Sequence, residues 1–161
     1  MKPEISVIVP IYNEEENLPL LAERLSTVMR STGRSYECLF VDDGSSDRSV
    51  EVARSLKNGF PELKIVRLRR NFGQTAALAA GFDSAAGDII VTLDADLQND
   101  PADIPMLLEK ISQGYDLVNG WRKRRRDPWL RVLPSVLANR LISRVTRVRL
   151  HDYGCTLKAY R

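Results

Sequence analysis

The sequence predicts one α/β domain: a Rossmann-like, three-layer sandwich with a mostly parallel central sheet. Two observations lead to this fold class. Short β-branched runs alternate with longer stretches of helical periodicity, which is typical of parallel strands joined by right-handed helical crossovers. The chain has 161 residues, of which 43% are apolar, so it can fill one core, and its two cysteines cannot form a disulfide scaffold. Disorder and a disulfide-rich fold are therefore excluded.

Each element is expected from its own residue pattern. The β-branched runs predict strands at Ile5–Val9, Tyr36–Val41, Leu63–Leu68, Asp88–Leu93 and Tyr115–Val118. Apolar residues spaced three and four apart predict helices at Asn17–Ser31, Asp47–Leu56, Gln74–Ala86 and Asp103–Gln113. Ser45 or Ser46 is the expected N-cap of the second helix, and Pro101 leads into the fourth.

Charge divides the chain into two parts. Residues 119–161 contain 12 lysines and arginines against 2 acidic residues, whereas residues 1–118 contain 12 against 19. The basic part should face an anionic ligand or surface. In it, a helix expected from Pro134 to about Thr146 has an apolar stripe and an arginine-rich stripe. It is either a surface helix with solvated arginines or an interfacial helix on an anionic membrane.

Targeting and membrane segments are not expected in the chain as given. No stretch approaches the roughly 20 apolar residues of a membrane span, and the N-terminus has only a short apolar run before three glutamates. We therefore expect a chain that is soluble or peripheral to a membrane.

Acidic residues follow three of the predicted strands, in PIYNEEEN, VDDGSSD and LDADLQNDP. Ligands of open parallel sheets bind beyond the carboxyl ends of the strands, so these side chains should meet at one edge. The residues concerned are Glu14, Asp42, Asp43, Asp94 and Asp96. Like charges gathered in this way need a cation or a ligand rich in hydrogen-bond donors.

The Asp94-Ala95-Asp96 step is the sharpest of these motifs. Residues two apart on an extended segment point the same way, so both carboxylates can serve one metal ion. Gln98 follows, and no Cys or His is nearby, which favours Mg²⁺ or Mn²⁺ over zinc. Simple turn and cap chemistry is the alternative interpretation of such a motif.

VDDGSSD also has two interpretations. Asp-Gly-Ser-Ser can be a turn followed by a helix cap, with no ligand. Asp42 and Asp43, however, both lie at the expected ligand edge, where a carboxylate can accept hydrogen bonds from a ribose hydroxyl or a base N–H.

Three familiar kinds of site are excluded by motifs that the sequence lacks. The absence of GxGxxG argues against an NAD site, the absence of GxxxxGK(S/T) against a P-loop, and the absence of a nucleophile elbow against a triad hydrolase.

Taken in their order and spacing, PIYNEEEN, VDDGSSD, RNFGQTAALAAGFDSAAGD and LDADLQNDP resemble the motifs of family 2 glycosyltransferases with a GT-A fold, over essentially the whole chain. The intact DADLQ is similar to the branch that moves a sugar from a nucleotide donor to a polyprenyl phosphate. The ending HDYGCTLKAYR is similar to bacterial undecaprenyl-phosphate 4-deoxy-4-formamido-arabinose transferases, which prepare the sugar for lipid A modification. Glucosyl and mannosyl relatives carry related endings, so these donors stay open.

The resemblance implies a role for each matching residue. Pro10, Tyr12, Glu14 and Asp42, with the adjacent Asp43, would hold the nucleotide. Asp94 would lie near the ribose, the sugar and a Mg²⁺ or Mn²⁺ ion, and Asp96 and Gln98 would bind that ion. The acceptor phosphate would be received by arginines of the basic region: Arg122, Arg126 and Arg131. Asp94, Asp96 and Arg122 would be the catalytic set.

The resemblance also implies partners and a location. We expect inverting transfer from a nucleotide-sugar, preferably a UDP-sugar, to undecaprenyl phosphate at the cytoplasmic face of the inner membrane. Relatives usually continue beyond the last motif, so we expect a truncated catalytic domain with a nucleotide and metal part at 1–118 and an acceptor part at 119–161. Association into a homo-oligomer is open.

Two other classes of function compete with the transferase. A non-catalytic membrane or nucleic-acid binding module would use the basic region, but the acidic strand ends would repel nucleic acid, so no nucleic-acid partner is expected. A receiver-like phosphotransfer domain would require a lysine after the fifth strand, where the chain has Asn119 and Gly120.

Overall fold

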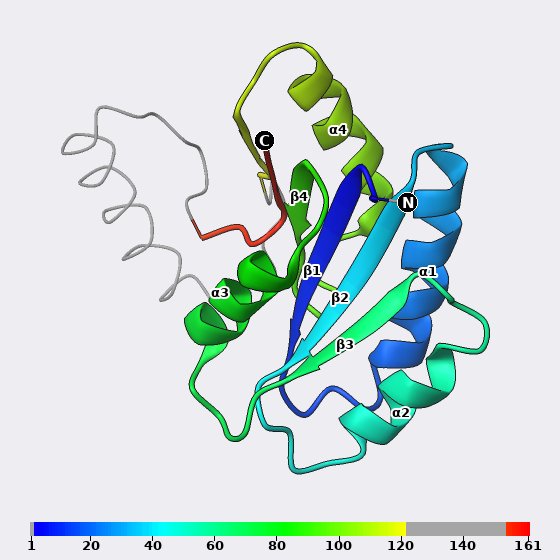
Figure 1. The fold of residues 1–161 in the computed structure, drawn as a ribbon, viewed down its shortest axis with the longest axis vertical. Helices are drawn as coiled ribbons and strands as arrows, with labels where there is room; N and C mark the ends of the chain where they lie inside the picture. The colour runs from blue at the N-terminus through cyan, green and yellow to red at the C-terminus, as the bar shows by residue number, and fades with distance from the viewer. Residues whose placement is uncertain (1, 122–153) are drawn as a thin grey trace, which may run out of the picture.

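The computed structural model describes residues 2–121 and 154–161, which form one six-stranded sheet with helices on both faces (Figure 1). The strands are β1 Ile5–Ile11, β2 Tyr36–Asp42, β3 Leu63–Arg67, β4 Ile89–Thr92, β5 Leu117–Asn119 and β6 Lys158–Tyr160. The helices are α1 Leu18–Ser31, α2 Ser49–Leu56, α3 Gln74–Ser84 and α4 Ile104–Ser112, with a short 3-10 turn at Pro101–Asp103 before α4.

The strands lie in the order β3-β2-β1-β4-β6-β5. β1 pairs in parallel with β2 and β4, and β2 pairs in parallel with β3. β6 is antiparallel to both β4 and β5. The predicted mostly parallel sheet is therefore confirmed, and the strand order reverses between β1 and β4.

β6 is the strand that the sequence reading missed. Three residues are too few to show the alternation of apolar and polar side chains that predicts a strand. They form a strand because they pair with the edges of β4 and β5. β6 comes from the basic part of the chain, so the two parts divided by charge share one sheet.

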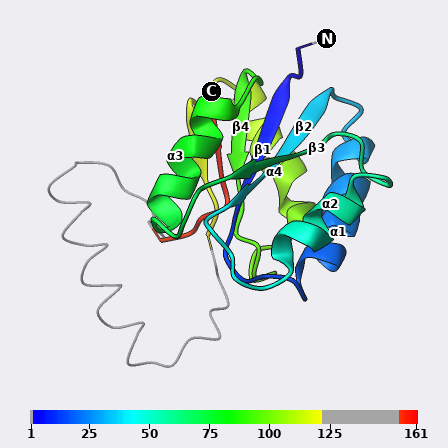
Figure 2. The ribbon, with the colours of Figure 1, turned by 60° about the horizontal axis from the view of Figure 1, so that its bottom comes forward.

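Helices cover the two faces unequally. α1, α2 and α4 pack on the face that carries Val7 and Val9, while α3 packs on the face that carries Ile8 (Figure 2). Val7 and Ile8 are both 0% exposed, which explains why β1 is a continuous apolar run rather than an alternating one. α3 approaches closely because Gly81 faces Ile8, and a Cβ at Gly81 would lie 2.4 Å from the Ile8 side chain.

The predicted serine cap of α2 is wrong. The helix begins at Ser49 after Arg48, and no side chain caps it. Ser45 and Ser46 instead bond to Asn13 in the neighbouring loop. Ser45 and Ser46 therefore contact the loop after β1 and do not cap α2.

Some sequence predictions lie outside the described residues. They are the helix from Pro134 to Thr146 and the arginines Arg122, Arg126 and Arg131. Within residues 2–121 and 154–161, no helix combines the length and the apolar content needed to cross a membrane.

A buried carboxylate ties the amino-terminal edge of the sheet together. Glu37 on β2 is 2% exposed. Its Oε1 accepts hydrogen bonds from Ser6 Oγ at 2.7 Å and from the Ala86 backbone at 2.7 Å, and its Oε2 pairs with Lys64 Nζ at 2.6 Å. Burial alone would raise the pKa of Glu37, but the hydrogen bonds from Lys64, Ser6 and Ala86 hold it below its ordinary value.

We expect Glu37→Gln to destabilise the protein at neutral pH by about 1–3 kcal/mol, because bonds to the charged group are lost. The pKa of Glu37 is lower in the folded protein than in the unfolded chain. The stabilisation that its charged form contributes is therefore complete above the unfolded-state pKa of about 4.3. It is lost as the pH falls through the folded-state pKa. Urea unfolding of both proteins at several pH values measures it. Glu23→Gln, at an exposed site on α1, is the control. A Glu37→Gln difference that does not shrink on acidification would contradict this role.

Candidate functional site

A cavity of about 340 Å³ lies at the carboxyl ends of β1 and β4, where the strand order reverses. This is the expected ligand position in an open α/β sheet. Six predicted site residues meet there: Pro10, Tyr12, Glu14, Asp43, Asp94 and Asp96. The sequence reading assigned no role to three other polar or glycine residues that line it: Asn71, Gly73 and Gln74.

The two aspartates after β4 lie on the cavity side of their loop. Leu93 and Ala95 are buried, at 0% and 3% exposure, whereas Asp94 is partly exposed and Asp96 is exposed. Both aspartates line the cavity, together with Ala95. Asp96 Oδ1 accepts a hydrogen bond from the Gln98 backbone at 3.1 Å. Leu97 between them has φ 60°, in the left-handed region. The alternation of buried and exposed side chains therefore continues from Leu93 to Asp96, although the backbone bends from residue 95 onward.

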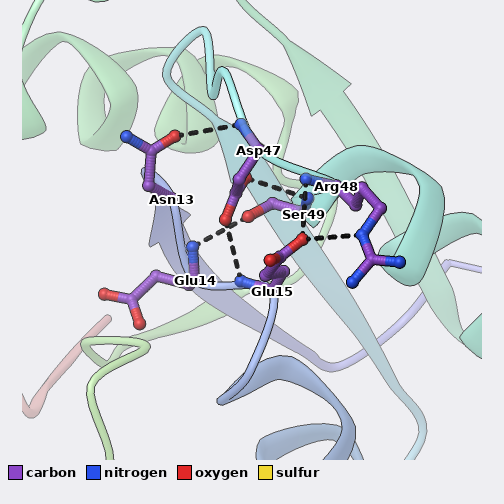
Figure 3. A network of polar contacts seen from close by, with 6 residues as sticks. All are labelled: Asn13, Glu14, Glu15, Asp47, Arg48 and Ser49. Carbon is purple, nitrogen blue, oxygen red and sulfur yellow. Dashed lines mark hydrogen bonds and ion pairs between the residues drawn. The ribbon is translucent and has the colours of Figure 1, made fainter.

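The loop after β1 is held by a network of polar contacts with the loop after β2 (Figure 3). Asn13, at φ 57°, accepts a hydrogen bond from the Ser46 backbone at 2.8 Å through its side chain. Its own backbone N–H donates to Ser45 Oγ at 3.0 Å. An asparagine suits this position because it tolerates the left-handed conformation.

The next two residues continue the network. The Glu14 backbone donates to Ser49 Oγ at 2.8 Å, and the Glu15 backbone donates to Asp47 Oδ2 at 3.1 Å. Arg48 Nε donates to Glu15 Oε2 at 3.1 Å (Figure 3). Burial raises the pKa of Asp47, but hydrogen bonds from Ser49 and the Glu15 backbone outweigh it and hold the pKa low. These contacts position Glu14 at the wall of the cavity.

Asp43 holds the loop that follows β3. It is 3% exposed, and its two carboxylate oxygens accept the backbone N–H groups of Phe72 and Gly73, each at 2.8 Å. This pair of bonds brings Asn71 and Gln74 to the cavity. The sequence signal for these residues is a glycine, Gly73, followed by a polar residue at the start of a helix that comes after a strand.

Two predicted residues are not brought into this cavity. Asp42 is 2% exposed, accepts a hydrogen bond from the Ser45 backbone at 3.1 Å, and lies 3.5 Å from Arg67 Nε. Asp42 and Asp43 thus both lie at the carboxyl end of β2, but only Asp43 lines this cavity, because successive residues at a strand end point to different sides. Gln98 lines a separate cavity of about 260 Å³ beside Trp121 and Cys155.

The cavity is acidic and suits a divalent cation. Four carboxylates line it, from Glu14, Asp43, Asp94 and Asp96, and its described lining contains no Lys, Arg or His. Nowhere in residues 2–121 and 154–161 do three His, Cys, Asp or Glu side chains lie close enough to hold a metal. Two carboxylates with oxygens from a bound diphosphate and water are nevertheless a usual ligand set for Mg²⁺. The residues therefore fit an ion that binds together with a nucleotide.

This geometry agrees with the known proteins that the chain matches. Residues 6–161 match glycosyl transferase family 2, and the chain belongs to that family. One relative in sequence is undecaprenyl-phosphate 4-deoxy-4-formamido-L-arabinose transferase from Pseudomonas paraeruginosa. It is 49% identical over 159 residues, which are 98% of this chain and 47% of the relative. The chain thus spans about half the length of that protein.

Solved structures confirm the GT-A fold. Glucosyl-3-phosphoglycerate synthase from Mycobacterium tuberculosis, in complex with Mn²⁺, uridine diphosphate and phosphoglyceric acid, matches with a TM-score of 0.75. It is 23% identical, over 98% of this chain and 55% of that one. A mannosyltransferase from Pyrobaculum calidifontis, in complex with GDP-Man and Mn²⁺, matches with a TM-score of 0.66 and 22% identity, over 99% and 45% of the chains. At these identities the likeness concerns the fold alone.

Proposed function

We propose that the protein transfers 4-deoxy-4-formamido-L-arabinose from a UDP-sugar to undecaprenyl phosphate, the step that prepares this sugar for lipid A modification. The observation that carries the proposal is the acidic cavity at the reversal of strand order, with Asp94 and Asp96, two positions apart in sequence, on its wall. The 49% identity to a transferase of this name supports the choice of sugar and acceptor.

The cavity residues divide into two groups in this proposal. Pro10, Tyr12, Glu14 and Asp43 hold the base and ribose, and Asp42 supports them from the end of β2. Asp94 and Asp96 would hold a Mg²⁺ or Mn²⁺ ion, with Gln98 of the same loop as a further ligand. When bound, the ion neutralises the negative charge that grows on the departing diphosphate.

The reaction needs no protein nucleophile. An oxygen of the acceptor phosphate attacks the anomeric carbon and forms the new C–O bond. The bond from that carbon to the nucleoside diphosphate breaks on the opposite side, its electron pair leaves with the diphosphate, and the configuration inverts. A phosphate monoester is largely ionised at pH 7 because its second pKa is near 6, so a strong general base is unnecessary. The described cavity wall, which contains acids and amides but no histidine or lysine, agrees with this chemistry.

The basic part of the chain supplies the acceptor side of the proposal. Arg122, with Arg126 or Arg131, receives the acceptor phosphate, since arginine binds phosphate bidentately and keeps its charge. The same region contacts the anionic surface of the inner membrane from the cytoplasm, where the isoprenoid of the acceptor lies. Membership in a transferase family argues against the non-catalytic module and the receiver-like domain.

Nucleotide titration tests the donor. We expect UDP to bind to the protein with an affinity that rises when Mn²⁺ is added, because the acidic cavity otherwise repels a diphosphate. Calorimetry with UDP and GDP, each with and without Mn²⁺, measures this preference. GDP binding in place of UDP would favour a mannose donor, and UDP-glucose used better than the formamido sugar would favour a glucose donor. A folded protein that binds neither nucleotide would contradict the transferase proposal.

A further inference from the structure

A side chain that the resemblance leaves without a role contacts one of the two proposed metal-binding aspartates. Gln74 Nε2 donates a hydrogen bond to Asp94 Oδ1 at 2.6 Å. Gln74 is the first residue of α3, and Asp94 follows β4, so the bond joins two elements across the cavity that both residues line. A bond from an amide to a carboxylate is charge-assisted and stronger than a neutral one.

The backbone that carries Gln74 is itself fixed. The two residues before it, Phe72 and Gly73, donate their backbone N–H groups to the buried carboxylate of Asp43. The loop after β3 comes close to the end of β2 because position 44 is a glycine: a Cβ at Gly44 would lie 2.4 Å from the Arg70 carbonyl carbon. Gly73 has φ 94°, which turns the chain directly into α3. The amide of Gln74 therefore extends from a support that is tied to the end of β2.

We propose that Gln74 is a positioning residue that holds the Asp94 carboxylate in the orientation required for the divalent ion. This inference rests on the proposed function. A carboxylate at a half-exposed position can adopt several rotamers, and fixing one oxygen removes that freedom before the ion arrives. Partners of metal ligands commonly act in this way, and their loss weakens metal binding by about 10- to 100-fold.

The test compares Gln74→Met and Gln74→Ala with wild type and with Thr75→Ala. Methionine keeps the length of the side chain without the donor, and Thr75 is an exposed neighbour on α3 that does not line the cavity. Mn²⁺ affinity at saturating UDP, UDP affinity without metal, and the melting temperature are measured for each protein. We expect both Gln74 variants to bind Mn²⁺ about tenfold more weakly. UDP affinity without metal and the melting temperature should match those of Thr75→Ala.

Four results would overturn the inference, and they can be told apart. Unchanged Mn²⁺ affinity in both Gln74 variants would mean that Asp94 needs no support from Gln74. An equal loss of metal-free UDP affinity would make Gln74 a nucleotide contact, and a loss that follows the melting temperature would make it a structural residue. A wild-type protein that binds neither UDP nor Mn²⁺ would instead overturn the proposed function, and the inference with it.

Discussion

Asp96→Asn is expected to reduce sugar transfer by roughly a hundredfold or more, because the metal ion loses a charged ligand and the departing diphosphate loses its compensation. The fold should remain intact, since Asp96 is exposed and its Oδ1 accepts only a local bond from the Gln98 backbone. Transfer assays with Mg²⁺ or Mn²⁺, together with Mn²⁺ titration in the presence of UDP, measure the effect.

Asp83→Asn is the matched control for this change. It removes the same charge from an exposed position on α3, and Asp83 does not line the cavity. We expect Asp83→Asn to behave as wild type in both assays. Transfer by Asp96→Asn at nearly the wild-type rate with metal present would remove Asp96 from the metal site.

Gly44→Ala is expected to lower the free energy of unfolding by about 2–5 kcal/mol, with two additive causes. Gly44 has φ 72°, which costs an L residue about 1–2 kcal/mol. A Cβ there would also lie 2.4 Å from the Arg70 carbonyl carbon and 2.6 Å from the Asn71 nitrogen, so backbone must move. Because the displaced loop carries Asn71, Gly73 and Gln74, metal-dependent UDP binding should weaken as well.

Gly33→Ala separates the two causes. Gly33 has φ 66°, but a Cβ there would meet nothing within 4 Å. We therefore expect Gly33→Ala to lose only the conformational part, about 1–2 kcal/mol, and to bind UDP normally. Urea unfolding and UDP titration of the two variants give the comparison. Equal losses of stability in both would show that the close contact between Gly44 and the 70–71 backbone is unimportant.

The elements that the sequence predicted well are those with a strong local period. The strand expected at Ile5–Val9 and the helix expected at Asn17–Ser31 are present as β1 and α1, with ends that differ by one or two residues. Their apolar spacing is a property of neighbouring residues, so it can be read without the fold. The strand expected at Tyr115–Val118 is instead Leu117–Asn119, because its pairing with β6 decides which residues extend.

The candidate site was predictable in part for a similar reason. Residues at and after the carboxyl ends of β1, β2 and β4 had to meet at one edge of a parallel sheet, and six of the predicted ones line the cavity. Gln74 was not found because its importance depends on Asp94, twenty positions away in sequence, and on a bond that only the folded chain makes.

By itself, the sequence determined the order of strands and helices, the acidic edge of the sheet and the family, because each depends on residue types at short spacing. Only the tertiary structure decided that β6 enters between β4 and β5 and that Asp43, not Asp42, lines the cavity. It also decided that Asp43 ties the loop after β3 to the end of β2. These features arise from contacts between segments far apart in the chain, where hydrogen-bond partners and close packing select one arrangement among several that local patterns allow.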